Sequence, residues 1–181
     1  MVFTESKGLQ NQKSNTPKLS LQYEKIAVDT HTLRSLDWDR SRFDIEFGLR
    51  NGTTYNSFLI RGTKTALIDT SHLKFKDIWF EQLKKEINPK EIDFLIVSHT
   101  EPDHSGLIRY LIELNPNIEI VASKVAIKFL EDQIHQPFQS KAVKSGEELN
   151  LGINSISGIE HKIEFISAPN LHWPDTIFSF D

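Results

Sequence analysis

The chain has 181 residues, a net charge of −4 and no cysteine, with 38% hydrophobic and 25% charged residues. This length suits one domain with a sizeable core, and the weak acidity gives no general attraction to nucleic acid or anionic membranes. Without cysteine the chain forms no disulfide, thiolate-bound zinc site, cysteine-ligated iron–sulfur cluster or cysteine nucleophile, so any metal must be held by His, Asp and Glu.

The amino-terminal segment, residues 1–24, is polar, and we expect it to be a disordered lead-in. Its first 20 residues are rich in Ser, Asn, Gln and Lys and lack the apolar stretch of a secretory signal. No apolar run approaches the roughly 18 residues that span a bilayer. We therefore expect a cytoplasmic protein, with neither nucleic acid nor membrane as a partner, and a folded domain over residues 25–181.

The first predicted elements are strands. Residues 25–32 have strand character, residues 36–47 mix charged and aromatic side chains, and Asn51-Gly52 is a typical hairpin turn pair. Residues 54–60 and 65–69 then predict two paired strands. Together these segments indicate an antiparallel opening meander.

Helices and strands alternate after residue 69. Residues 76–87 carry apolar side chains at helical spacing, and Pro89 closes that segment. Residues 91–98 contain a continuous apolar run, which suits a strand buried on both faces. The later predicted elements are a helix over 107–114, a strand over 118–122, a helix over 123–134 with Ser123 as its N-cap, and short strands over 142–143, 149–151, 162–166 and 176–180.

This order predicts an α+β fold in which two sheets pack face to face with helices outside, an αββα sandwich. A doubly wound parallel sheet fits less well, because the opening hairpin and the closing short strands are antiparallel in character.

The stretch that indicates chemistry is His99-Thr100-Glu101-Pro102-Asp103-His104, with four potential metal ligands in six residues. It lies where a buried strand gives way to a helix, and ligands at the carboxyl end of a strand are held rigidly yet project into a crevice. In an extended segment, residues two apart point the same way, which places His99, Glu101 and Asp103 on one side. His104 can turn to a neighbouring position as the chain enters the helix. One loop can therefore bind two metal ions, one through His99 and Glu101 and the other through Asp103 and His104.

The types of donor atom limit which metal ions the site would bind. Two imidazoles and two carboxylates without a thiolate suit iron, manganese or zinc. The hard oxygen donors favour iron, although zinc accepts the same set. The alternative, that these groups are ordinary solvated side chains, is disfavoured because polar clusters seldom follow a buried strand without partners.

A second polar loop, residues 168–175, follows another apolar strand. Its His172 can bring a third imidazole to the same crevice, although a single loop histidine is commonplace. Trp173 is either a packing residue or the neighbour of a cofactor. Asp175 and Ser105 are interpreted as hydrogen-bond partners or turn residues rather than ligands. The remaining histidines are interpreted as structural or exposed, with His72 also a candidate support of the site: His31, His72, His135 and His161.

The His-x-Glu-x-Asp-His turn at residues 99–104, together with Leu-His-Trp-Pro-Asp at residues 171–175, resembles the flavodiiron proteins, also called A-type flavoproteins. The generic metallo-β-lactamase pattern has His where Glu101 stands, so this Glu is the more specific mark. The segments that resemble most closely the cyanobacterial-type diflavin branch are residues 35–48, 51–60, 68–72, 98–106 and 168–176.

The resemblance implies a metallo-β-lactamase-like αββα fold and a centre of two iron ions. His99, Glu101 and His172 would bind one iron, and Asp103 and His104 would bind the other. The implied activity is that of an NAD(P)H:oxygen oxidoreductase, which reduces dioxygen to water, or nitric oxide to nitrous oxide. Electrons would pass from NAD(P)H through FMN and, in the diflavin branch, a second flavin. A head-to-tail homo- or hetero-dimer is implied, with Trp173 as the candidate neighbour of the FMN.

The chain departs from the family pattern at its end. It stops at Asp181, before the family's bridging Asp and last His, and it contains neither the flavodoxin-like nor the flavin reductase domain. We therefore expect a fragment of the diiron domain, truncated before its second half is complete. Two other interpretations remain open: a zinc metallo-hydrolase of the metallo-β-lactamase superfamily, and a non-enzymatic chain, either an inactive truncated remnant or a domain that serves only in oligomerisation.

Overall fold

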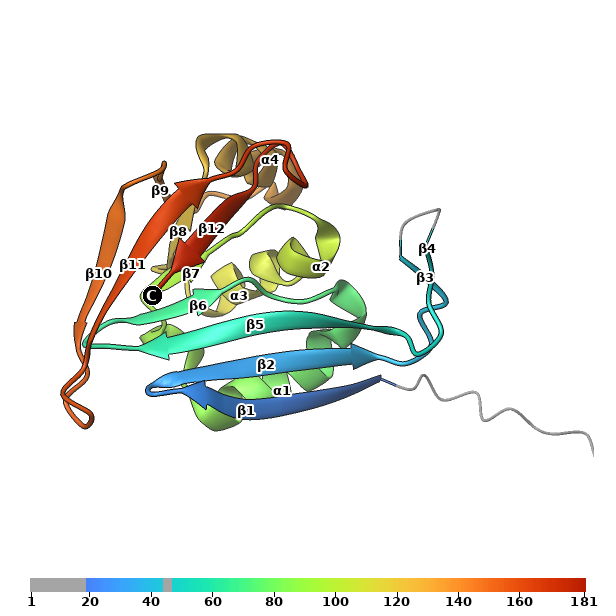
Figure 1. Cartoon of the computed structure of the whole chain (residues 1–181), viewed down its shortest axis with the longest axis horizontal. Helices are drawn as coiled ribbons and strands as arrows, with labels where there is room; N and C mark the ends of the chain where they lie inside the picture. The colour runs from blue at the N-terminus through green and yellow to red at the C-terminus, as the bar shows by residue number, and fades with distance from the viewer. Residues whose placement is uncertain (1–18, 44–46) are drawn as a thin grey trace, which may run out of the picture.

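The structure is a computed structural model that describes residues 19–43 and 47–181. Within these residues the strands form a seven-stranded sheet, a three-stranded sheet and a two-stranded ribbon (Figure 1). The seven-stranded sheet has the order β1 (Leu19–Ala27), β2 (Thr30–Asp37), β5 (Thr53–Arg61), β6 (Thr65–Ile68), β7 (Phe94–Ile96), β8 (Glu119–Ala122) and β9 (Gln139–Ala142). The others are β10 (Glu148–Ile153), β11 (Glu160–Ser167) and β12 (Ile177–Phe180), and the ribbon of β3 (Arg42–Phe43) and β4 (Phe47–Gly48).

The large sheet changes from antiparallel to parallel at β6. The pairs from β1 to β6 are antiparallel, whereas β6, β7, β8 and β9 pair in parallel and need crossover connections. Because β6, β7 and β8 are parallel, their carboxyl ends meet at one edge of the sheet. The helical segments are η1 (Leu73–Phe75), α1 (Lys76–Glu86), η2 (Pro89–Glu91), α2 (Pro102–Ser105), α3 (Ile108–Leu114) and α4 (Lys124–Ile134).

Two apolar cores lie on the two faces of the large sheet. Neighbouring strand residues alternate between them, as the pleat of a strand requires. Leu95 packs with residues of α1, α3 and α4, including the fully buried Trp79. Phe94 and Ile96 instead face the three-stranded sheet and its buried Phe165. The described residues therefore form three of the four expected layers: helices, large sheet and small sheet (Figure 1).

Most elements lie where the sequence predicts them. The β5–β6 hairpin, the three longer helices and the closing strands are confirmed. Of the closing strands, β10 to β12 pair in the expected antiparallel sense, whereas β9 pairs in parallel with β8. Ser123 is the N-cap of α4, because its Oγ accepts the backbone N–H of Ala126 at 3.0 Å. Among the described residues, none of the helices is both long and apolar enough to cross a bilayer.

The opening of the chain differs from the prediction. β1 begins at Leu19, so the folded domain starts at least six residues before the expected boundary at residue 25. Leu19, Leu21 and Tyr23 alternate with polar residues and pack against the helix-side core, which is the pattern of a half-buried strand. The rest of the expected lead-in, residues 1–18, lies outside the described residues.

Two other expectations about the opening segment, one strand and one turn, are wrong. Residues 25–32 were expected to form one strand, but the chain turns between β1 and β2 at Asp29, which has a φ of +59°. Asn51-Gly52 lies between β4 and β5. These two strands do not pair with each other, because β5 pairs with β2 and β6, so Asn51-Gly52 is not the expected hairpin turn. Gly52 instead permits a close crossing: a Cβ there would lie 2.0 Å from the carbonyl oxygen of Asp37.

Candidate metal centre

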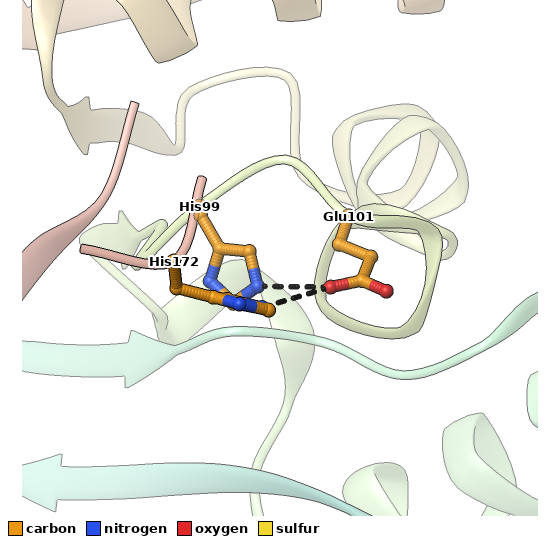
Figure 2. A group of neighbouring side chains, drawn as sticks. All are labelled: His99, Glu101 and His172. Atoms are coloured by element: carbon orange, nitrogen blue, oxygen red, sulfur yellow. Dashed lines mark hydrogen bonds and ion pairs between the residues drawn. The ribbon is translucent and has the colours of Figure 1, made fainter. Parts of the chain in front are cut away.

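His99, Glu101 and His172 converge on one point (Figure 2). The Nε2 atoms of His99 and His172 lie 3.4 and 3.1 Å from the same Glu101 oxygen, Oε2. One ligand atom from each residue can be chosen so that all three lie within 4.8 Å of one another. His99 and Glu101 are two apart on an extended stretch, which points both side chains the same way. His172 reaches them from the loop between β11 and β12.

Asp103 and His104 lie on α2 rather than on a continued extended segment. The helix begins at Pro102, whose fixed φ suits a first helical position. The expectation that Asp103 continues the row of His99 and Glu101 is therefore wrong, because the alternation ends at Glu101. The helical turn still gathers both residues at the site. His104 Nε2 lies 3.6 Å from Asp103 Oδ2, and the His104 and His99 ring centroids are 4.0 Å apart.

Asp69 is a site residue that the sequence reasoning missed. It directly follows β6 and has a φ of +57°, a left-handed conformation that costs energy and persists where the surroundings impose it. Its Oδ1 accepts the backbone N–H of Ser98 at 2.7 Å, and its Oδ2 accepts a hydrogen bond from His104 Nδ1 at 2.9 Å. Since a carboxylate only accepts, this bond assigns the proton to Nδ1 and leaves His104 Nε2 free to accept a metal ion.

The electrostatic environment of the cluster favours a cation. Burial of the ring, and then the neighbouring His104, lower the pKa of His99, which keeps its imidazole neutral and available as a ligand. Burial opposes protonation of His104, but the hydrogen bond and charge of Asp69 outweigh it and raise the pKa of His104. Burial, aided by the charge of Glu101, raises the pKa of Asp103. A metal ion would relieve this crowding of carboxylates.

A metal ion also fits an unpaired atom of the site. Asp103 Oδ1 is buried and has no hydrogen-bond partner within residues 19–43 and 47–181, which is costly unless another group satisfies it. Nitrogen and oxygen donors without a thiolate suit iron, manganese or zinc. The residues present therefore fit the iron that the resemblance implies, and they accept zinc as well.

The residues interpreted as supports make the expected contacts. Ser105 Oγ lies 2.9 and 3.1 Å from the carbonyl oxygens of Thr100 and Glu101, to which it donates. Asp175 Oδ2 accepts the backbone N–H of Thr100 at 2.8 Å. The ring of Trp173 lies 6.1 Å from that of His99, so Trp173 borders the site.

The other histidines lie outside the cluster. His31 stacks on Tyr23, with 5.0 Å between ring centroids, and His135 ends α4 in a left-handed conformation. His72 caps η1, because its Nδ1 accepts the backbone N–H of Lys74, which is a structural contact. His161 was expected to lack clustered partners, and that expectation is wrong. It is 4% exposed and lies between two carboxylates, 2.8 Å from Asp181 and 3.4 Å from Asp29.

A cavity of about 360 Å³ adjoins the imidazoles. Its lining combines the polar side chains of His99, His104 and His172 with the apolar side chains of Phe58, Ile68 and Phe178. A cavity of this volume lies within the range of small-molecule binding sites.

The family model described as "ODP family beta lactamase" matches residues 53–181, well over half of the chain. The chain belongs to this family of β-lactamase-like domains. The match and the solved flavodiiron cores confirm the metallo-β-lactamase-like fold class.

Relatives of this ODP family member are flavodiiron proteins. Diflavin flavoprotein A 1 of Synechocystis sp. strain PCC 6803 is 56% identical over 164 residues, which cover 91% of this chain and 28% of that protein. The metal-soaked flavodiiron core of Flv1 from Synechocystis sp. PCC6803 has a TM-score of 0.81 at 32% identity, covering 91% of this chain and 40% of that one. Rubredoxin oxygen:oxidoreductase of Desulfovibrio gigas has a TM-score of 0.79 at 32% identity, covering 88% and 38%.

The chain thus corresponds to part of the β-lactamase-like region of the cyanobacterial diflavin flavoproteins and spans less than a third of the length of the relative from Synechocystis. This homology supports an oxidoreductase role. The matched residues 53–181 contain all five side chains that the resemblance implies as iron ligands.

Proposed function

We propose that this chain provides the iron-binding part of an oxidoreductase that reduces dioxygen to water. The observation that carries the proposal is the convergence of His99 and His172 on one oxygen of Glu101, the residue that distinguishes the flavodiiron pattern from the generic metallo-β-lactamase pattern. The similarity to an oxygen:oxidoreductase supports the choice of substrate, and the cavity beside the imidazoles provides space for a small molecule.

We propose that different residues of the chain bind the two iron ions. His99, Glu101 and His172 would hold one iron, and Asp103 and His104 the other. Bound iron would supply one-electron redox chemistry that no protein side chain here provides. Asp69 fixes the tautomer of His104, and the carboxylates offset the positive charge of the metals.

Electrons must come from outside the chain. We propose that they arrive from NAD(P)H through FMN and a second flavin, supplied by domains of a longer protein or by a partner in a head-to-tail dimer. Trp173 borders the site beside His99, so it is the residue we propose to face the FMN. Reduction of one dioxygen to two waters takes four electrons and four protons, which two molecules of fully reduced FMN would supply.

An oxygen-electrode experiment tests this function. Reduced FMN alone converts dioxygen to hydrogen peroxide, so added catalase returns half of the consumed oxygen. We expect the chain loaded anaerobically with ferrous iron to consume oxygen with little return, because the product is water. Glu101→Gln is the matched control, since it preserves shape but removes the charged ligand, and catalase should again return oxygen from it. If catalase returned half of the oxygen consumed with the wild-type chain, the product would be hydrogen peroxide and the proposal would be refuted.

The same preparation separates the rival functions. Nitrous oxide formed in the headspace under nitric oxide, with no oxygen consumption in the electrode cell, would favour nitric oxide as the substrate. Stoichiometric zinc after growth with both metals, together with esterase or lactamase turnover, would favour a metallo-hydrolase. Absence of binding of either metal would favour an inactive remnant.

A further inference from the structure

The buried carboxylate of Asp175 joins the two loops that carry the first set of ligands. Asp175 is 1% exposed, and its Oδ2 accepts the backbone N–H of Thr100 at 2.8 Å. Thr100 lies between His99 and Glu101 in the chain, and His172 lies three residues before Asp175. One hydrogen bond therefore connects the loop of His172 to the turn that presents the other two ligands.

The main chain around Asp175 is anchored at two further points. The N–H of Ile177 donates to the carbonyl of Ser98 at 2.9 Å, which places the start of β12 beside the end of β7. The hydroxyl of Ser123, the N-cap of α4, donates to the carbonyl of Asp175 at 2.8 Å. These bonds hold the backbone of Asp175. The bond from its side chain is the one that reaches the ligand turn itself.

Packing alone does not account for a carboxylate at this position. Asp175 Oδ1 is buried and has no hydrogen-bond partner among the described residues. A buried carboxylate with one unsatisfied oxygen is costly, and an apolar side chain of similar size would avoid that cost. What the carboxylate gains in return is the bond to Thr100, which fixes the ligand turn.

We propose that Asp175 is a positioning residue of the metal centre, whose carboxylate sets the place of His172 relative to His99 and Glu101. The proposal rests on the proposed function in one respect, namely that these three residues bind a metal ion. Groups that orient metal ligands contribute about 10-fold to 100-fold in metal affinity. Asp175 acts through the positions of the ligands, so its effect depends on His172 being present.

A double-mutant cycle on Co²⁺ binding tests this dependence. Co²⁺ is titrated into the full 181-residue chain, and its visible spectrum reports the coordination of the ion. We expect Asp175→Ala to lower Co²⁺ affinity about tenfold and to shift the spectrum toward that of His172→Ala. In the His172→Ala background the same substitution should change the affinity less than about twofold, because the ligand that it positions is already gone.

Two further variants keep the test specific. Asp175→Asn retains an oxygen acceptor for the Thr100 N–H, so it should stay within about threefold of the wild type. Asp93→Ala is a matched control far from the ligands, because Asp93 also accepts a backbone N–H, that of Thr65 at 2.8 Å. It should leave the affinity and the spectrum unchanged.

The outcomes separate this inference from the function on which it rests. If the wild-type chain binds no Co²⁺, the metal centre itself is refuted. If the wild type binds Co²⁺ and Asp175→Ala binds it equally well, only the positioning role is overturned. Equal losses in both backgrounds overturn it too, since a general loss of structure would not depend on His172.

Discussion

Gly106→Ala is the change whose effect on the site follows most directly from geometry. Gly106 directly follows α2 and has helical backbone angles, so alanine meets no conformational obstacle. The obstacle is space, because a Cβ there would lie 2.5 Å from the Pro102 carbonyl oxygen and 2.9 Å from the Ser71 carbonyl oxygen. Ordinary contact begins at 3.4 Å, so backbone must move by about 0.9 Å. The segment that must move carries Asp103 and His104.

Overpacking of this kind costs about 1–3 kcal/mol. For a chain of this size each kcal/mol lowers the melting temperature by about 2–4 °C, so we expect a fall of roughly 2–12 °C. Displacement of two ligands should also weaken ferrous iron binding about tenfold. Calorimetry and an anaerobic competition titration against a chelator measure the two effects. Gly48→Ala is the matched control, since no atom of the described part of the chain lies within 4 Å of its Cβ position. Wild-type melting and iron affinity in Gly106→Ala would refute the reasoning.

Two other predictions concern stability. Burial opposes protonation of His161, but the hydrogen bonds that its ring donates to Asp181 and Asp29 outweigh burial and raise the pKa of His161. The stabilisation is therefore full below the unfolded value of about 6.5 and is lost as pH rises through the higher folded value. In a buffer that contains a chelator, the melting temperature of the wild type should exceed that of His161→Gln by less at about pH 8.5 than at about pH 5.5. A difference that grows with pH would contradict this prediction. Trp79→Ala, at a fully buried core position, should cost about 3–5 kcal/mol in urea unfolding, and a loss below about 1 kcal/mol would count against the described core.

The parts of the fold that depend on local pattern could be predicted from the sequence. The apolar spacing in α1, the N-cap at Ser123 and the β5–β6 hairpin are short-range signals, and they are confirmed. β1 was missed because its alternating residues lie in a polar segment, where composition masks the period of two. The turn at Asp29 was missed because aspartate in a left-handed conformation leaves only a weak mark in a sequence.

In the candidate site, too, local contacts could be predicted from the sequence, whereas contacts between distant residues could not. His99 and Glu101 are two apart on an extended stretch, so their convergence follows from local geometry. Asp69 could not be assigned without the order of the strands, because its contact with His104 joins residues 35 apart in the chain across the parallel β6–β7 pair. His161 meets Asp29 across 132 residues, and the sequence contains no local signal of that contact.

The most direct test of the metal centre is anomalous diffraction at the iron edge, from crystals of the chain grown anaerobically with ferrous iron. The account predicts an anomalous peak bounded by His99 Nε2, His172 Nε2 and the Glu101 carboxylate, with a second beside Asp103 and His104. Iron-loaded crystals with no peak among His99, Glu101 and His172, or with iron bound only elsewhere on the chain, would contradict it.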